Sequence, residues 1–175
     1  MRALVTGASE GLGRAFAMRL AQEGWAVTAV ARNEARLTEL TAELGGAPHD
    51  HLVADLAQPD GVARCIERLR GERYALLVNN AGYSQFGEFA EADVDEEAKI
   101  LAVNCEAAMR LAHAHLERAQ PGDALINLSS ITYWLPTPIQ PTYVAARNSM
   151  NRSSGSVSNS RRLWYPSSKA VLNSA

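Results

Sequence analysis

Apolar residues recur along the first 128 positions in two alternating patterns. Short apolar runs of strand length alternate with longer segments in which apolar residues return at helical spacing. The predicted strands are residues 3–5, 25–30, 51–54, 75–78 and 124–128, and the predicted helices are residues 12–23, 33–44, 60–70 and 92–118. In the first helix the apolar positions include Leu12, Ala15 and Leu20. Asn33 is the expected N-cap of the second helix.

Regular alternation of strands and helices predicts an α/β domain, with a doubly wound parallel sheet covered by helices on both faces. Ligands bind such sheets beyond the carboxyl ends of the strands. The residues that follow the predicted strands are therefore the candidate site. They are residues 7–13, Arg32, Asp55, residues 79–82 and the pair Ser129-Ser130.

The pattern changes at residue 148. Only four serines precede it, whereas residues 148–175 contain nine, and regular apolar spacing fades there. We therefore divide the chain into a domain at residues 1–147 and an atypical serine-rich tail at residues 148–175. The composition of the tail is typical of disorder or of a sequence read out of frame.

Composition and charge argue against several classes of protein. The formal net charge of -2 gives no basic footprint for nucleic acid, and no apolar run reaches the length of a membrane span. The N-terminus lacks a signal-peptide pattern. Cys65 and Cys105 make neither a disulfide framework nor a metal-ligand spacing. We expect a cytoplasmic protein that binds no metal, nucleic acid or membrane.

A glycine-rich loop joins the first predicted strand to the first predicted helix. Its sequence is Thr6-Gly7-Ala8-Ser9-Glu10-Gly11-Leu12-Gly13. Glycines permit a tight turn and a close backbone approach to a pyrophosphate, and the helix N-terminus adds free N–H groups. The predicted contacts to a dinucleotide are Gly7, Ser9, Glu10, Gly11, Leu12 and Gly13.

Further motifs, in the same order along the chain, resemble the short-chain dehydrogenase/reductase family. The loop follows the family's Thr-Gly-x-x-x-Gly-x-Gly pattern, and the resemblance covers residues 1 to about 147. The other matches are Asp55-Leu56, Asn79-Asn80-Ala81-Gly82, Asn104, and Ser130 followed 13 positions later by Tyr143. The resemblance implies a Rossmann-type dinucleotide-binding domain in which Asp55, Leu56, Asn79, Ala81 and Gly82 help to hold the cofactor.

The end of the second predicted strand bears on the choice of dinucleotide. An NAD-selective fold places a carboxylate there to bind the ribose 2′-OH, but here Arg32 follows the strand. A guanidinium suits a 2′-phosphate through bidentate, charge-assisted hydrogen bonds. Glu10 counts slightly against this, because many phosphate-preferring relatives carry a basic residue at its position. We predict NADP(H) in preference to NAD(H).

The resemblance also implies a set of catalytic residues. Tyr143 would be the general acid/base, Ser130 would orient a substrate carbonyl, and Asn104 would position a proton-relay water. A tyrosine hydroxyl, whose ordinary pKa is about 10, needs a nearby cation to work near neutral pH. The family has a lysine four residues after the tyrosine, where this chain has Arg147. Arginine supplies the charge, but its planar fork differs from a compact ammonium, so we expect reduced turnover.

A second match occurs in the tail, where Tyr165-Pro166-Ser167-Ser168-Lys169-Ala170 fits the tyrosine–lysine pattern at the start of a helix. Tyr165 and Lys169 are therefore alternative catalytic residues, although Tyr165 lies 35 residues after Ser130. Two explanations stay open: an insertion that delays the motif, or a tail read out of frame. Codons for residues 164–167, read one base along, permit Gly-Ile-Gln-Val, which would suit a sixth strand. The sequence of the source DNA distinguishes the two explanations.

On either explanation the chain resembles a member that is incomplete at its C-terminal end. A sheet that ends at the fifth strand would leave an edge and apolar surface uncovered, which favours self-association or a homo-oligomer. The predicted function is an NADP(H)-dependent oxidoreductase that acts on a small-molecule carbonyl or alcohol. The alternative is a non-catalytic dinucleotide-binding fragment, or an interaction module without turnover. Arg147 and the missing C-terminal part leave both open.

Overall fold

The computed structural model describes residues 1–46, 48–131, 139–149, 155–157 and 164–165. Its centre is a sheet of five parallel strands in the order β3-β2-β1-β4-β5. The strands are β1 (Arg2–Thr6), β2 (Ala26–Ala31), β3 (Asp50–Val53), β4 (Leu76–Asn79) and β5 (Ala124–Asn127). The direction of winding reverses between β1 and β4, which is where such sheets bind ligands. The predicted doubly wound parallel sheet is confirmed.

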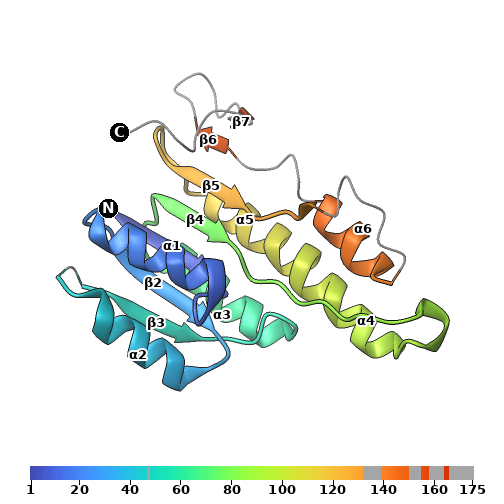
Figure 1. The fold of residues 1–175 in the computed structure, drawn as a ribbon. Coiled ribbons are helices and arrows are strands. Elements are labelled where there is room, and N and C mark those ends of the chain that lie inside the picture. The colour runs from blue at the N-terminus through green and yellow to red at the C-terminus, as the bar shows by residue number, and fades with distance from the viewer. Residues whose placement is uncertain (47, 132–138, 150–154, 158–163, 166–175) are drawn as a thin grey trace.

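Helices cover both faces of this sheet (Figure 1). One layer holds α1 (Gly11–Gln22) and α2 (Glu34–Leu44), and the other holds α3 (Pro59–Gly71) and α5 (Ala108–Leu116). Side chains alternate along β1: Ala3 and Val5 pack with α1 and α2, whereas Leu4 packs with α3 and α5. Burial on two faces explains why the central strands β1, β2 and β4 are mainly apolar.

The buried side of α1 differs in part from the predicted one. Leu12 is 67% exposed and Ala15 is also exposed, whereas Leu20 is buried as predicted, together with Gly13 and Ala17. The close approach of Gly13 to the Gly7 carbonyl determines which side of the helix faces the sheet. For α2 the prediction is confirmed, because the Asn33 side chain caps the helix by accepting a hydrogen bond from the Arg36 N–H at 3.0 Å.

The predicted helix at residues 92–118 is interrupted. After a 3-10 turn at Phe89–Glu91, α4 (Val94–Leu101) leads into a π-helical segment, η2 (Ala102–Ala107), and then into α5. The Asn104 side chain donates a hydrogen bond to the Ile100 carbonyl at 2.9 Å. An α-helix would pair that carbonyl with the backbone N–H of Asn104, so the side chain competes with regular helical pairing.

Beyond β5, the structure describes α6 (Pro141–Ser149) and two short strands, β6 (Gly155–Val157) and β7 (Trp164–Tyr165). Both strands add to the sheet antiparallel, and β6 pairs with β5. Ala124 and Leu125 of β5 therefore have backbone partners on the side away from β4, while the division of the chain at residue 148 stays a prediction. Tyr165 lies in β7 rather than at the start of a helix, and Lys169 lies outside the described residues.

Among the helices described, none has the length and apolar character needed to cross a membrane.

Candidate functional site

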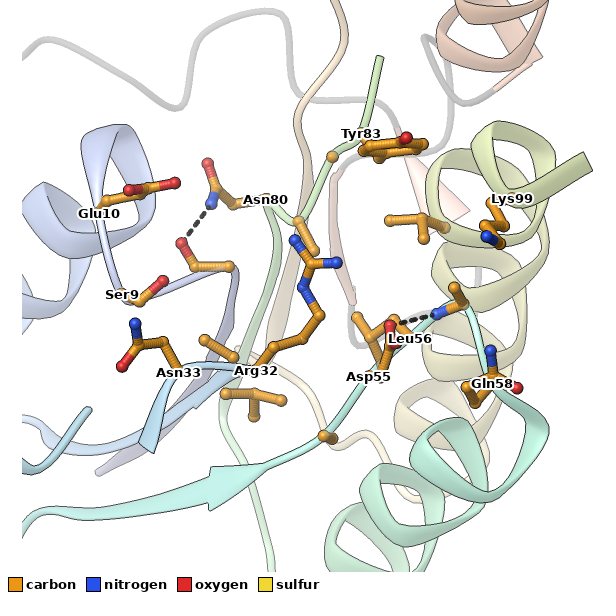
Figure 2. A pocket seen from close by; sticks show the side chains of 18 of the residues that line it. Ser9, Glu10, Arg32, Asn33, Asp55, Leu56, Gln58, Asn80, Tyr83 and Lys99 are labelled. Atoms are coloured by element: carbon orange, nitrogen blue, oxygen red, sulfur yellow. Dashed lines mark hydrogen bonds between the residues drawn. The ribbon is translucent and has the colours of Figure 1, made fainter. Parts of the chain in front are cut away.

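A cavity of about 760 Å³ opens at the carboxyl ends of the parallel strands. Its walls come from the glycine loop, the ends of β2 and β3, the segment after β4, and side chains of α4, η2 and α6 (Figure 2). The predicted site residues that line it are Gly7, Ser9, Glu10, Arg32, Asp55, Leu56, Ala81, Gly82 and Arg147. Those that do not line it are Gly11, Leu12, Gly13, Asn79, Asn104, Ser130 and Tyr143.

The glycine loop has the shape of a phosphate cradle. Gly11 has φ +55°, a conformation that favours glycine, and no heavy atom lies within 4 Å of the place where its Cβ would be. Glu10 is the N-cap of α1 but makes no side-chain capping hydrogen bond, so the first N–H groups of the helix have no side-chain cap. An open glycine beside an uncapped helix N-terminus fits a pyrophosphate.

Thr6 and Asn80 fasten this loop to the segment after β4. The Thr6 hydroxyl accepts hydrogen bonds from the backbone N–H groups of Asn80 and Ala81, both at 3.0 Å. The Asn80 side chain donates to the carbonyls of Thr6 at 2.9 Å and Gly7 at 3.2 Å. Asn80 also lines the cavity, whereas Asn79 points into the protein and donates to the Asn127 side chain. Asn80 is thus a cavity residue that was not among the predicted contacts, whereas Asn79 of the same motif was predicted and does not line the cavity.

Arg32 reaches into the cavity from the end of β2. Figure 2 shows its side chain running between Ser9 and Asn80 on one side and Asp55 and Leu56 on the other. Arg32 is exposed. Within the described part of the chain no acidic residue lies within ion-pair distance of it. Asp55 is used locally, because its Oδ1 accepts a hydrogen bond from the Ala57 N–H at 3.0 Å and shapes the turn after β3.

Arg147 lies at the other end of the cavity and is buried. Its Nη1 donates to the Leu128 carbonyl at 2.9 Å, and its own carbonyl accepts from the Ser129 hydroxyl at 3.1 Å. Its guanidinium lies over the Tyr143 ring. These contacts join α6 to the end of β5, and so bring Tyr143 and Arg147 to the segment that contains Ser130.

Gly82 is the contact point between Arg147 and Asn104. A Cβ at Gly82 would overlap the Arg147 guanidinium and would lie 3.1 Å from the Asn104 Oδ1. The Asn104 Oδ1 accepts from the Tyr83 N–H at 3.2 Å, and its Nδ2 donates to the Tyr83 carbonyl at 2.6 Å. Asn104 therefore holds the segment after Gly82 against the helix, and its proton-relay role stays a prediction.

A polar network that the sequence analysis did not identify forms the wall near α4. The Tyr83 hydroxyl donates to Glu96 at 2.8 Å, and Glu96 also pairs with Lys99. The hydrogen bond from Lys99, and then that from Tyr83, lowers the pKa of the Glu96 carboxyl. All three residues line the cavity. The acidic residues around Glu96 are typical of a solvent-exposed helix start, so no sequence motif identified Glu96 as a residue of the cavity wall.

The model of the short chain dehydrogenase family matches residues 1–164. The chain belongs to this family. A very-long-chain 3-oxoacyl-CoA reductase from Pyricularia oryzae is 31% identical to it, over 83% of this chain and 47% of that protein. A 3beta-hydroxysteroid dehydrogenase from Mediterraneibacter gnavus is 32% identical, over 85% of this chain and 56% of that protein. The chain thus spans about half the length of these curated relatives.

A solved family structure resembles the chain closely. The short-chain dehydrogenase from Sphingobium yanoikuyae, solved in complex with NADPH, superposes with a TM-score of 0.79 at 32% identity. The match covers 84% of this chain and 60% of that one. The cavity of this chain lies at the carboxyl ends of the parallel strands, where such sheets bind ligands, so it is the candidate cofactor site.

Proposed function

We propose that this chain is an NADP(H)-dependent oxidoreductase that acts on the carbonyl or alcohol group of a small molecule. The proposal rests on the position of Arg32. Its guanidinium is exposed and points into the cavity, and it has no acidic partner among the described residues. Next to the cavity wall at Glu10 lie the open turn at Gly11 and the uncapped N-terminus of α1, which suit the pyrophosphate. A cation beside them suits a second phosphate group. The NADPH complex of the Sphingobium relative supports this cofactor.

We propose residues 1–147 as the dinucleotide-binding domain. One end of its cavity would bind the adenosine part of the cofactor, and the other end would carry out the chemistry. The adenosine end would be held by Arg32, Asp55 and Leu56. When bound, NADP(H) would exchange a hydride with the substrate. Beside Arg147, at the opposite end of the cavity, Tyr143 would transfer the proton, Ser130 would orient the substrate oxygen, and Arg147 would supply positive charge.

The decisive experiment compares cofactor binding by the wild-type chain and by Arg32→Gln, through titration of NADPH and NADH fluorescence. We expect Arg32→Gln to weaken NADPH binding about tenfold or more and to leave NADH binding nearly unchanged, because one charge-assisted phosphate contact is lost. Arg19→Gln is the matched control, because Arg19 is an exposed arginine of α1 that pairs with Glu23 and does not line the cavity. A wild-type chain that binds neither dinucleotide would contradict the proposal.

A second candidate function is dinucleotide binding without turnover. The engagement of Arg147 favours it, because that guanidinium is buried and bonded to the Leu128 carbonyl. A lysine ammonium would be a compact donor at the same place. An assay of NADPH oxidation with a panel of ketones and aldehydes separates the two functions. Binding with turnover supports the oxidoreductase, and binding without turnover selects the second candidate.

A further inference from the structure

An ion pair crosses the adenosine end of the cavity. The Glu10 carboxylate at the start of α1 pairs with the Arg36 guanidinium in the first turn of α2. Both residues line the cavity, and their side chains are 73% and 54% exposed. Glu10 does not cap its own helix, so its carboxylate is available to Arg36.

The local structure around Asn33 explains why Arg36 is near the cavity. Asn33 caps α2 through the backbone N–H of Arg36, so Arg36 is the third residue of the helix and lies in its first turn. Arg32 precedes that cap and lines the same end of the cavity. Two guanidiniums therefore border this end: Arg32 has no acidic partner among the described residues, and Arg36 is held by Glu10.

The Glu10–Arg36 pair is of a kind that a ligand can open. Both side chains are more than half exposed, so solvent and salt screen their attraction. A phosphate group carries more charge than a carboxylate and offers three acceptor oxygens to a guanidinium. A phosphate that enters this end of the cavity can therefore compete with Glu10 for Arg36.

We propose that Arg36 is a second ligand of the 2′-phosphate, and that Glu10 competes for it and so limits the preference of this chain for NADP(H) over NAD(H). The inference rests on the proposed function, since it needs a dinucleotide in this cavity. The inference adds to the proposed function a pair of residues, outside the end of β2, that determines cofactor specificity. On binding of the phosphorylated cofactor, Arg36 exchanges the Glu10 carboxylate for the phosphate, and Glu10 turns to solvent.

The test uses two probes that lack the nicotinamide, adenosine 2′,5′-bisphosphate and 5′-AMP, in calorimetric titrations of the full chain. We expect Glu10→Gln to tighten binding of the bisphosphate about two- to fivefold, because a competing exposed ion pair is removed, and to leave 5′-AMP unaffected. Arg36→Gln should weaken bisphosphate binding about tenfold. In the double variant the effect of Glu10→Gln should disappear, since no Arg36 remains to be released.

A matched control is present in the same pair of helices. Arg14 of α1 and Glu43 of α2 form an ion pair at 2.5 Å that does not line the cavity. Glu43→Gln loosens the contact between the same helices, so it should change binding of neither probe. An equal effect of Glu10→Gln on both probes, or one that persists beside Arg36→Gln, would overturn the proposal.

Failure of this inference differs from failure of the proposed function. If the wild-type chain binds neither probe, the cofactor site itself is wrong and both proposals fail. If it prefers the bisphosphate, and Arg32→Gln abolishes that preference while Arg36→Gln changes nothing, the proposed function stands and the role of Arg36 is overturned.

Discussion

The guanidinium carbon of Arg147 lies 5.6 Å from the centre of the Tyr143 ring. The two residues are four apart on α6, so they share one side of the helix. The arginine is held by its hydrogen bond to the Leu128 carbonyl, and Gly82 leaves the room that its guanidinium needs. A cation is therefore present beside the tyrosine, but its shape and its hydrogen bonds are those of an arginine.

Arg147→Lys tests whether this shape limits the chemistry. We expect turnover of a carbonyl substrate with NADPH to rise about tenfold or more, because a compact ammonium can approach the tyrosine and the cofactor more freely. Stability should fall by about 1–2 kcal/mol, since the Leu128 hydrogen bond and the contact with the ring are lost. Steady-state assays and urea denaturation measure the two effects. Arg110→Lys, at an exposed position paired with Glu106, is the control. Unchanged turnover with intact NADPH binding would contradict the expectation.

Gly13→Ala tests the close packing beneath the glycine loop. A Cβ at Gly13 would collide with the Gly7 carbonyl and the Asn80 side chain, so the loop must move. We expect the free energy of unfolding to fall by about 2 kcal/mol or more, with loss of dinucleotide binding. Gly71→Ala is the control, because no heavy atom lies within 4 Å of a Cβ there, and it should change stability by less than about 1 kcal/mol. Equal effects of the two substitutions would count against this account of the loop.

Thr6→Val tests the hydroxyl that fastens the loop to the segment after β4. Valine has a similar shape but cannot accept the hydrogen bonds from the N–H groups of Asn80 and Ala81. Thr6 is buried, so we expect a loss of about 2 kcal/mol of stability and weaker cofactor binding. Thr38→Val, at an exposed helical threonine, should have a small effect on both. Thermal denaturation and NADPH titration provide the readouts, and a stable Thr6→Val chain with normal affinity would disprove this role of Thr6.

His115 predicts a dependence of stability on pH. Burial lowers the pKa of its imidazole below the ordinary value of 6.5, and its Nε2 lies 3.0 Å from the Ala124 carbonyl. The unfolded chain binds the proton more readily, so stability present above about pH 6.5 is lost as the pH falls, by at most about 1.4 kcal/mol per pH unit. Urea denaturation between pH 5 and 7.5 should show this loss.

His115→Gln should reduce that dependence, whereas His113→Gln should retain it. His113 lies on the same helix but is exposed, with a side chain that is 74% accessible beside Glu117. If the two variants show the same slope of stability against pH below 6.5, another group is responsible.

Much of the framework follows from local patterns. Apolar runs and helical spacing predicted all five parallel strands, and Asn33 was recognisable as a cap because its side chain acts on the N–H three residues later. The order of the motifs indicated the family, because glycine turns and strand ends have strict local requirements. Local patterns could not predict the division of the helix at residues 92–118, since it depends on a side-chain contact between Asn104 and Ile100.

The amino-acid sequence by itself determined the alternation of strands and helices, the glycine turn, and the absence of an acidic residue immediately after β2. Each of these properties depends only on residues that are close to one another in the sequence, so it can be predicted from the sequence. Only the tertiary structure decided that Glu10 meets Arg36, that Asn80 and not Asn79 faces the cavity, and that Arg147 meets Gly82. Each of these contacts joins residues on different elements, and their side-chain directions follow from how the helices pack on the sheet.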